Sequence, residues 1–120
     1  MTTETKPTEA IQPQRINAIA SPNFVTVYAN NVQTITTFFD TSLTFGEMLG
    51  MEDGVLSVEK RARVVLTLPQ LKLLSMTLIQ QIDAYEKRFG TIHLPVEIIP
   101  PELLNYMNTI ANEEKPDESQ

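Results

Sequence analysis

Residues 69–90 carry the pattern that most constrains how this chain can fold. Pro69 suits the first position of a helix, where its missing N–H has no partner to lose. Gly90 suits the residue just after a helix, and Lys87 and Arg88 would complement the dipole of the last turn. Between them the apolar residues recur every three or four positions, as on one face of an α-helix: Leu71, Leu74, Leu78, Ile82, Tyr85 and Phe89. The sequence therefore predicts an amphipathic helix over Pro69–Phe89, about 32 Å long.

Several segments before this helix have the character of β-strands. The clearest is Val58–Thr67, where Val58, Lys60, Ala62, Val64 and Leu66 alternate with Glu59, Arg61, Arg63, Val65 and Thr67. Such alternation is typical of an antiparallel sheet with one face covered. Three further segments are rich in β-branched and aromatic residues and are also predicted strands: Phe24–Ala29, Val32–Phe38 and Leu43–Glu47.

The segments between these strands carry turn and loop residues. Ser21–Asn23 and Asp40–Ser42 are predicted turns, and Gly50–Gly54 is a predicted loop. Asn30–Asn31 interrupts the first strand pair, either as a tight hairpin or as a bulge within one bent strand. After the long helix, Pro95 limits residues 91–99 to an extended or edge segment, and Pro100-Pro101-Glu102 opens a shorter helix.

The predicted fold class is therefore α+β. We expect an antiparallel sheet of three to four strands, covered on one face by the long helix, with a short second helix near the C-terminus. Length and composition predict one domain over residues 21–112. The polar segments 1–20 and 113–120 are predicted to be a disordered arm and an acidic disordered tail, since neither can bury enough apolar surface to offset the entropy of ordering.

Charge and composition exclude several classes of function. The net charge is −6, and the C-terminal tail is acidic, which argues against general binding of nucleic acid. The chain has no cysteine, so disulfides, thiolate catalysis and cysteine-ligated zinc are excluded. We find no secretory signal and no apolar run long enough to span a membrane, so a cytoplasmic location and no membrane partner are expected.

No pattern for catalysis, cofactor binding or metal binding is evident, so we expect no enzyme activity and no cofactor. His93 is the sole histidine and lacks a neighbouring nucleophile or carboxylate in sequence. Asp40, Glu47, Glu52 and Asp53 gather around turns but lack the alternating oxygen ligands of a calcium loop. Arg61 and Arg63 share a strand face and could hold an anion, although pairing with Glu59 or Glu47 is the favoured interpretation.

Apolar side chains outside the main helix stripe are the remaining candidates for function. On the long helix they are Leu73, Met76 and Ile79, and on the second helix Leu103 and Met107. Apolar surface beyond the need of one small sheet often marks an interface. The alternative is that the second helix packs on the first and covers this surface, and the sequence leaves both open.

Taken in order, the segments resemble a family of small prokaryotic proteins, domain-of-unknown-function family 3467, over residues 23–92. The resemblance is carried by Tyr28–Val32, Leu43–Glu47, Arg63–Leu66, Pro69-Gln70 and Tyr85–Gly90. The chain departs from the family pattern at Leu68, which stands where a capping Ser is usual. The family has no assigned enzyme activity, which agrees with the lack of a catalytic pattern.

A fainter likeness links the predicted fold to the export chaperone SecB, which is similar in its antiparallel sheet and long C-terminal helix. Fold alone does not carry function. The leading expectation is therefore a non-enzymatic protein-binding or assembly module that associates with itself, as a homodimer or larger, and possibly with another protein. The alternatives are a SecB-like holdase for unfolded apolar segments, and a small anion-binding protein that uses Arg61 and Arg63.

Overall fold

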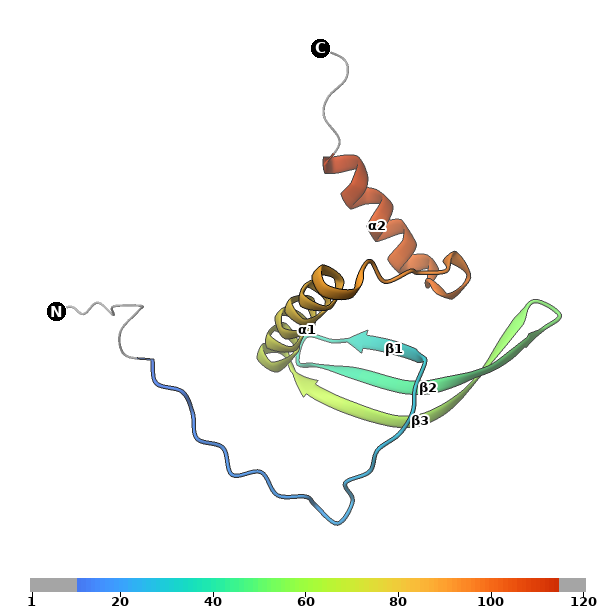
Figure 1. Ribbon diagram of the computed structural model, residues 1–120. Coiled ribbons are helices and arrows are strands. Elements are labelled where there is room, and N and C mark those ends of the chain that lie inside the picture. The colour runs from blue at the N-terminus through green and yellow to red at the C-terminus, as the bar shows by residue number, and fades with distance from the viewer. Residues whose placement is uncertain (1–10, 115–120) are drawn as a thin grey trace. The chain divides into compact units, whose positions relative to one another are not determined.

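The computed structural model describes residues 11–114 and has the predicted α+β class. Figure 1 shows the elements in chain order, and their bounds are β1 (Asn31–Thr36), β2 (Asp40–Glu52), β3 (Val55–Thr67), α1 (Leu68–Phe89), the short 3-10 helix η1 (Val96–Ile98) and α2 (Pro101–Glu114). The chain divides into two compact units, with the boundary between Val65 and Leu66. The sheet lies in the first unit and the long helix in the second, and cover of one sheet face by this helix stays a prediction.

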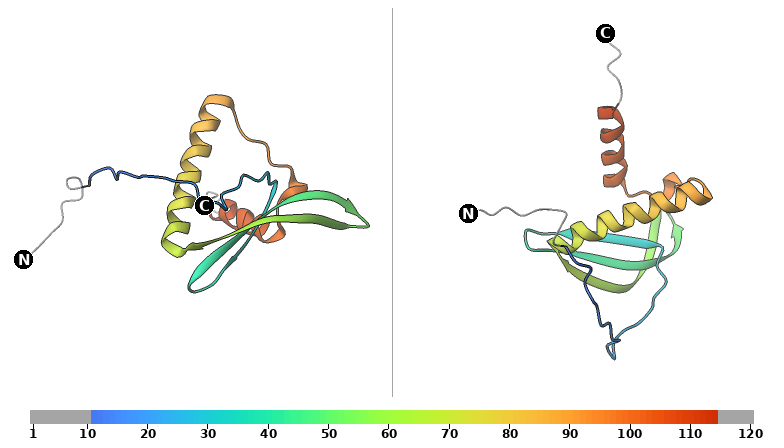
Figure 2. Two further views of the ribbon diagram at one scale, coloured as in Figure 1. Left: turned by 90° about the horizontal axis from the view of Figure 1, so that it is seen from below. Right: turned by 60° about the vertical axis from the view of Figure 1, so that its left-hand side comes forward.

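The first unit is built on an antiparallel sheet in the order β1-β2-β3. β1 pairs with the first half of β2, from Asn31 opposite Gly46 to Thr36 opposite Thr41. Beyond Gly46, β2 and β3 continue together as a twisted hairpin that β1 does not flank (Figure 2). The central strand is the best covered, since Thr41 and Gly46 are buried while most residues of β1 and β3 are exposed.

The predicted strand Phe24–Ala29 does not form, and the predicted strand after it begins one residue earlier, at Asn31. The backbone N–H of Asn30 donates to the carbonyl of Gly46 at 3.0 Å. The side-chain oxygen of Asn30 then accepts the N–H of Met48 at 2.8 Å, so a side chain takes the place of a neighbouring strand. Asn30–Asn31 is therefore neither a hairpin nor a bulge between two strands, but the bend that starts β1.

The turn between β1 and β2 lies at residues 37–39, not at the predicted Asp40–Ser42. Thr37 directs this turn, because its hydroxyl oxygen accepts the N–H of Phe39 at 3.1 Å and that of Asp40 at 3.2 Å. The N–H of Thr37 also donates to the carbonyl of Asp40 at 2.8 Å. Asp40 therefore already belongs to β2, and β2 is much longer than the predicted Leu43–Glu47.

The predicted loop Gly50–Gly54 is also shorter than expected, because β2 extends to Glu52 and β3 begins at Val55. Asp53 and Gly54 alone make the turn, with φ angles of 53° and 76°. Positive φ at both positions is what a two-residue type I′ hairpin requires, and its twist matches that of the strands.

We expect Gly54→Ala to lower the free energy of unfolding by about 1 kcal/mol, because a Cβ disfavours the positive φ at this position. Asp53→Asn is the matched control, since Asn tolerates positive φ and should change stability by less than about 0.5 kcal/mol. Urea unfolding at one fixed protein concentration measures both. Equal unfolding midpoints for wild type and Gly54→Ala would contradict the turn assignment.

The second unit contains α1, which runs one residue further than predicted at its start. Thr67 caps it, because its hydroxyl oxygen accepts the N–H of Gln70 at 3.3 Å. Leu68 therefore does not occupy the cap position, as the comparison with the family pattern implied, because the cap lies one residue earlier. At the other end Gly90, with φ 103°, donates its N–H to the carbonyl of Glu86 at 3.0 Å, as predicted for the C-terminal glycine.

The chain after α1 contains the predicted second helix. Residues 91–95 are irregular, and α2 begins at Pro101, within the predicted Pro100-Pro101-Glu102 start. It continues to Glu114, two residues past the predicted domain end. Of the predicted disordered arm and tail, residues 1–10 and 115–120 lie outside the described residues, and residues 11–20 have no helix or strand.

Candidate interaction surface

The histidine and the carboxylates singled out in the sequence form no metal-binding cluster in the described residues. Among residues 11–114 no three His, Asp or Glu side chains are grouped as metal ligands would be. His93 lies exposed in the irregular stretch after α1, in the second unit. Of the four carboxylates, Asp40, Glu47 and Glu52 lie on β2, where Glu52 is the last residue, and Asp53 lies in the β2–β3 turn.

The two arginines of β3 already have partners within the sheet. Arg61 forms ion pairs with Glu47 on β2 and, at 2.8 Å, with Glu59 on its own strand. Arg63 donates from Nε to the Thr44 hydroxyl at 3.1 Å. Pairing of this kind was the favoured interpretation of the cluster. An anion that bound at Arg61 would have to displace two carboxylates.

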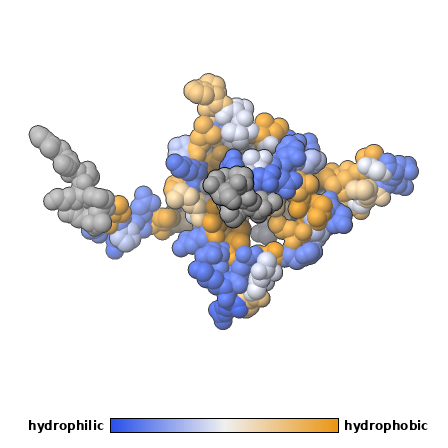
Figure 3. All heavy atoms as spheres, turned by 90° about the horizontal axis from the view of Figure 1, so that it is seen from above, coloured by the Kyte–Doolittle hydropathy of each residue, from blue (hydrophilic) through white to orange (hydrophobic). Residues whose placement is uncertain are grey.

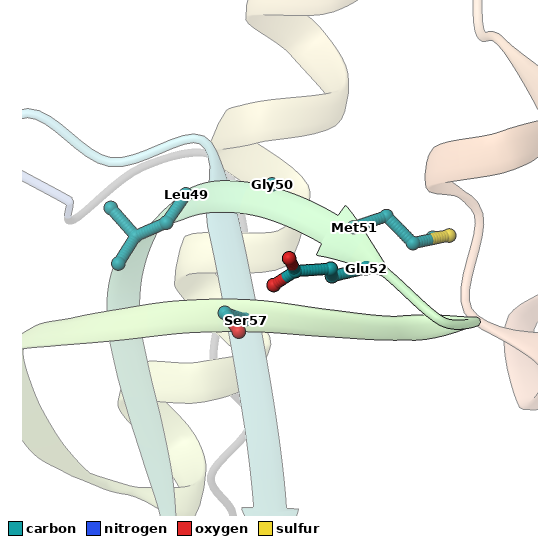
Figure 4. Close-up of a pocket in the computed structure, with 5 residues that line it drawn as sticks. All are labelled: Leu49, Gly50, Met51, Glu52 and Ser57. Carbon is teal, nitrogen blue, oxygen red and sulfur yellow. The ribbon is translucent and has the colours of Figure 1, made fainter.

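A shallow surface depression lies at the β2–β3 hairpin (Figure 4). Its lining residues are Leu49, Gly50, Met51, Glu52 and Ser57. Figure 4 shows the Leu49 and Met51 side chains extending away from each other, with the carboxylate of Glu52 between them. This lining offers one acidic group and one hydroxyl beside two flexible apolar side chains. It suits contact with another surface better than enclosure of a small ligand.

The helix residues predicted as an interface are exposed. On α1, Leu73, Met76 and Ile79 expose 57%, 58% and 66% of their surface, and they follow one another at intervals of three residues. On α2, Leu103 exposes 47% and Met107 exposes 37%. Figure 3 shows apolar side chains, in orange, at many points of the outer surface with polar residues between them.

A second apolar surface was missed by the sequence analysis, which treated its residues only as strands. It comprises Phe24–Ala29, β1 and the turn after it, and we call it the uncharged segment, residues 24–39. Its aromatic side chains are exposed by 64% to 85%: Phe24, Tyr28, Phe38 and Phe39. The rings of Phe38 and Phe39 meet edge to face at the β1–β2 turn, 5.2 Å apart. The signal was present in the sequence, since no charged residue occurs between Arg15 and Asp40.

These features define a small α+β protein in which apolar surface, and not a cluster of reactive groups, is the prominent feature of the described residues. Comparison with family models identifies the family directly: residues 1–94 match the family described as "Protein of unknown function (DUF3467)". The chain belongs to this family, as the resemblance predicted. The match begins earlier than the predicted residue 23 and leaves α2 outside it.

Two further comparisons, with curated proteins and with solved structures, identify no relative of this chain. Neither the curated proteins nor the solved structures include a significant match to this chain. The likeness to SecB therefore stays an expectation. Within residues 11–114, neither α1 nor α2 combines the length and the apolar character needed to cross a membrane.

Proposed function

We propose that this chain is a non-enzymatic module that binds protein through apolar surface, and that its first partner is a second copy of itself. The observation that carries the proposal is the exposure of Leu73, Met76 and Ile79 on α1, each above half. We call these three residues the α1 patch. Residues at this spacing lie near one another on a helix surface, so the patch is a continuous strip.

Burial of the α1 patch against another chain would be favourable. Full removal of one Leu, Ile or Met side chain from water contributes roughly 1.5–3 kcal/mol. Met76, at the centre of the strip, is unbranched and flexible, so it can adapt to the surface that it meets. Leu103 and Met107 on α2 add apolar area of the same kind within the second unit.

The alternatives gain less support from the same residues. An anion-binding role would need Arg61, and that guanidinium is paired with Glu47 and Glu59. A holdase would use exposed apolar side chains as well, but would bind many unrelated unfolded chains. Self-association and holdase activity therefore differ in selectivity, which an experiment can measure.

The proposal is tested by the solution mass of the full chain, measured by light scattering over a dilution series. We expect wild type to form a homodimer or larger, and Met76→Glu to raise its dissociation constant by at least about tenfold, because a carboxylate would be buried in the interface. Gln81→Glu is the matched control. It adds the same charge to α1 about 140° around the helix from Met76, and it should leave the mass unchanged.

The outcomes separate the candidate functions. A wild-type protein that stays monomeric at every concentration would refute self-association. If the same preparation suppressed aggregation of several unrelated unfolding enzymes at equal molar ratio, the holdase would replace our proposal. If Met76→Glu and Gln81→Glu lowered the average solution mass equally, the effect would come from the added charge and not from the α1 patch.

A further inference from the structure

The open edge of β1 carries backbone groups without a partner strand. β1 is an outer strand of the sheet, with β2 on one side. Thr37 donates its N–H to Asp40, and in an antiparallel pair such bonds alternate along the strand. The N–H and carbonyl groups of Val32, Thr34 and Thr36 therefore point away from β2, towards the open edge.

This edge has none of the features that usually prevent strands from pairing with other chains. Natural edge strands are protected by charged side chains, proline, bulges or short length. β1 reads Asn-Val-Gln-Thr-Ile-Thr, with neither charge nor proline, and its residues from Val32 to Thr36 are all exposed. The Phe24–Ala29 segment before it also has strand-forming residues and no charge, yet it pairs with no strand among residues 11–114.

We propose that β1 of one chain pairs antiparallel with β1 of a second copy, which makes one continuous sheet across a two-fold axis. This inference rests on the proposed self-association and adds a second contact to that of the α1 patch, so we expect Met76→Glu and changes on β1 each to weaken association. In such a symmetric contact a residue at the axis meets its own counterpart, and the other residues meet those equally far on the other side of the axis. A charge at the axis would face the same charge, whereas an uncharged edge pairs with itself without repulsion.

The two ends of the uncharged segment are complementary in the same arrangement. Antiparallel pairing about the middle of β1 takes Phe38 and Phe39 of one copy to the residues just before β1 of the other, next to Tyr28 and Ala29 at the bend. Each of the four exposed aromatic side chains can bury about 150–250 Å². Since 64% to 85% of each side chain is still exposed, the aromatic residues of both copies can supply a large part of the area of about 1,200–2,000 Å² that stable complexes bury.

The other edge of the sheet, formed by β3, explains why sheet pairing would stop at two copies and would not continue into a fibre. β3 carries Glu59, Lys60, Arg61 and Arg63 along its length. Charged residues on an edge strand discourage further strand addition. The sheet would therefore extend at β1 only, and a symmetric β1 contact is complete with two copies.

The first test is Thr34→Pro, compared with Thr34→Ala, by light scattering and far-UV circular dichroism. Proline removes the outward N–H of Thr34 and places its ring at the open edge, where β2 is not involved. We expect Thr34→Pro to raise the dissociation constant about 100-fold or more while the strand signal is kept. Thr34→Ala keeps the N–H and should associate like wild type. A Thr34→Pro protein that associates as tightly as wild type would overturn the proposal.

A second measurement does not depend on proline being tolerated. The chain has no cysteine, so one introduced at Val32, Gln33, Thr34 or Ile35 provides a unique site for a spin label. In an antiparallel β1 pair, the distance between the two labels has a minimum within β1 and grows by about 7 Å per residue away from it. An oligomer without this minimum would overturn the β1 pairing but leave self-association standing. A labelled protein without any dimer would overturn both.

Discussion

Gly46→Ala is expected to lower the free energy of unfolding by about 3 kcal/mol, the upper end of the usual cost of overpacking. Gly46 is buried on β2, where the sheet has strands on both sides. A Cβ at this position would lie 2.7 Å from the carbonyl oxygen of Glu59 and 2.8 Å from Cγ1 of Val58. The first of these is a backbone atom, so β3 would have to move to make room.

Urea unfolding followed by circular dichroism measures this effect at one fixed protein concentration, because association would add to apparent stability. Ser42→Ala is the matched control, since Ser42 is a half-buried residue of the same strand. It removes atoms instead of adding one and should cost less than about 1 kcal/mol. A Gly46→Ala protein as stable as wild type would show that β2 and β3 are further apart than described.

Thr41→Val is expected to cost about 2 kcal/mol, because it removes a hydroxyl that bonds twice at a buried site. Thr41 is 1% exposed and is the most buried side chain of the described residues. Its hydroxyl lies 2.7 Å from that of Thr36 and donates to the carbonyl of Ile35 at 3.3 Å. Valine keeps the shape of the side chain but leaves both β1 groups without this partner.

Thr36→Val is the comparison that isolates burial. It removes the other half of the threonine pair, but Thr36 is exposed and the Thr41 hydroxyl keeps its bond to Ile35. The cost should be less than half of that for Thr41→Val in the same urea experiment. If the exposed and the buried threonine gave equal losses, the hydrogen bonds at Thr41 would not be the source of the effect.

The elements with a long, regular pattern could be predicted from the sequence. α1 follows from the spacing of its leucines and β3 from its alternation, and both keep their predicted C-terminal ends. β2 was too short in the prediction, because Asp40–Ser42 has the composition of a turn and Gly50–Gly54 that of a loop. The β1–β2 turn was misplaced because the hydroxyl of Thr37, and not the more familiar Asp40, organises it.

Of the two candidate surfaces, one could be found from the sequence pattern and the other could not. The exposure of Leu73, Met76 and Ile79 could be predicted, because helix periodicity separates them from the main apolar stripe, whereas their role as an interface stays a prediction. The uncharged segment was missed as a surface. The local sequence pattern shows that Phe24–Ala29 suits a strand, but it does not show whether another strand is available to pair with this segment. The structure supplies this information: Asn30 makes the last hydrogen bonds to β2, so the Phe24–Ala29 segment before it does not pair with β2.

The short connections between the strands also have a consequence for how the chain reaches this structure. β1, β2 and β3 are consecutive, and their turns span only residues 37–39 and 53–54, so the sheet contains no pairing between segments distant in sequence. Folding is fast when contacts are local, and hairpins close in about 1–10 μs. All strand pairs of the described residues lie before α1 in the chain. On a translating ribosome the sheet can therefore form before either helix has left the ribosome.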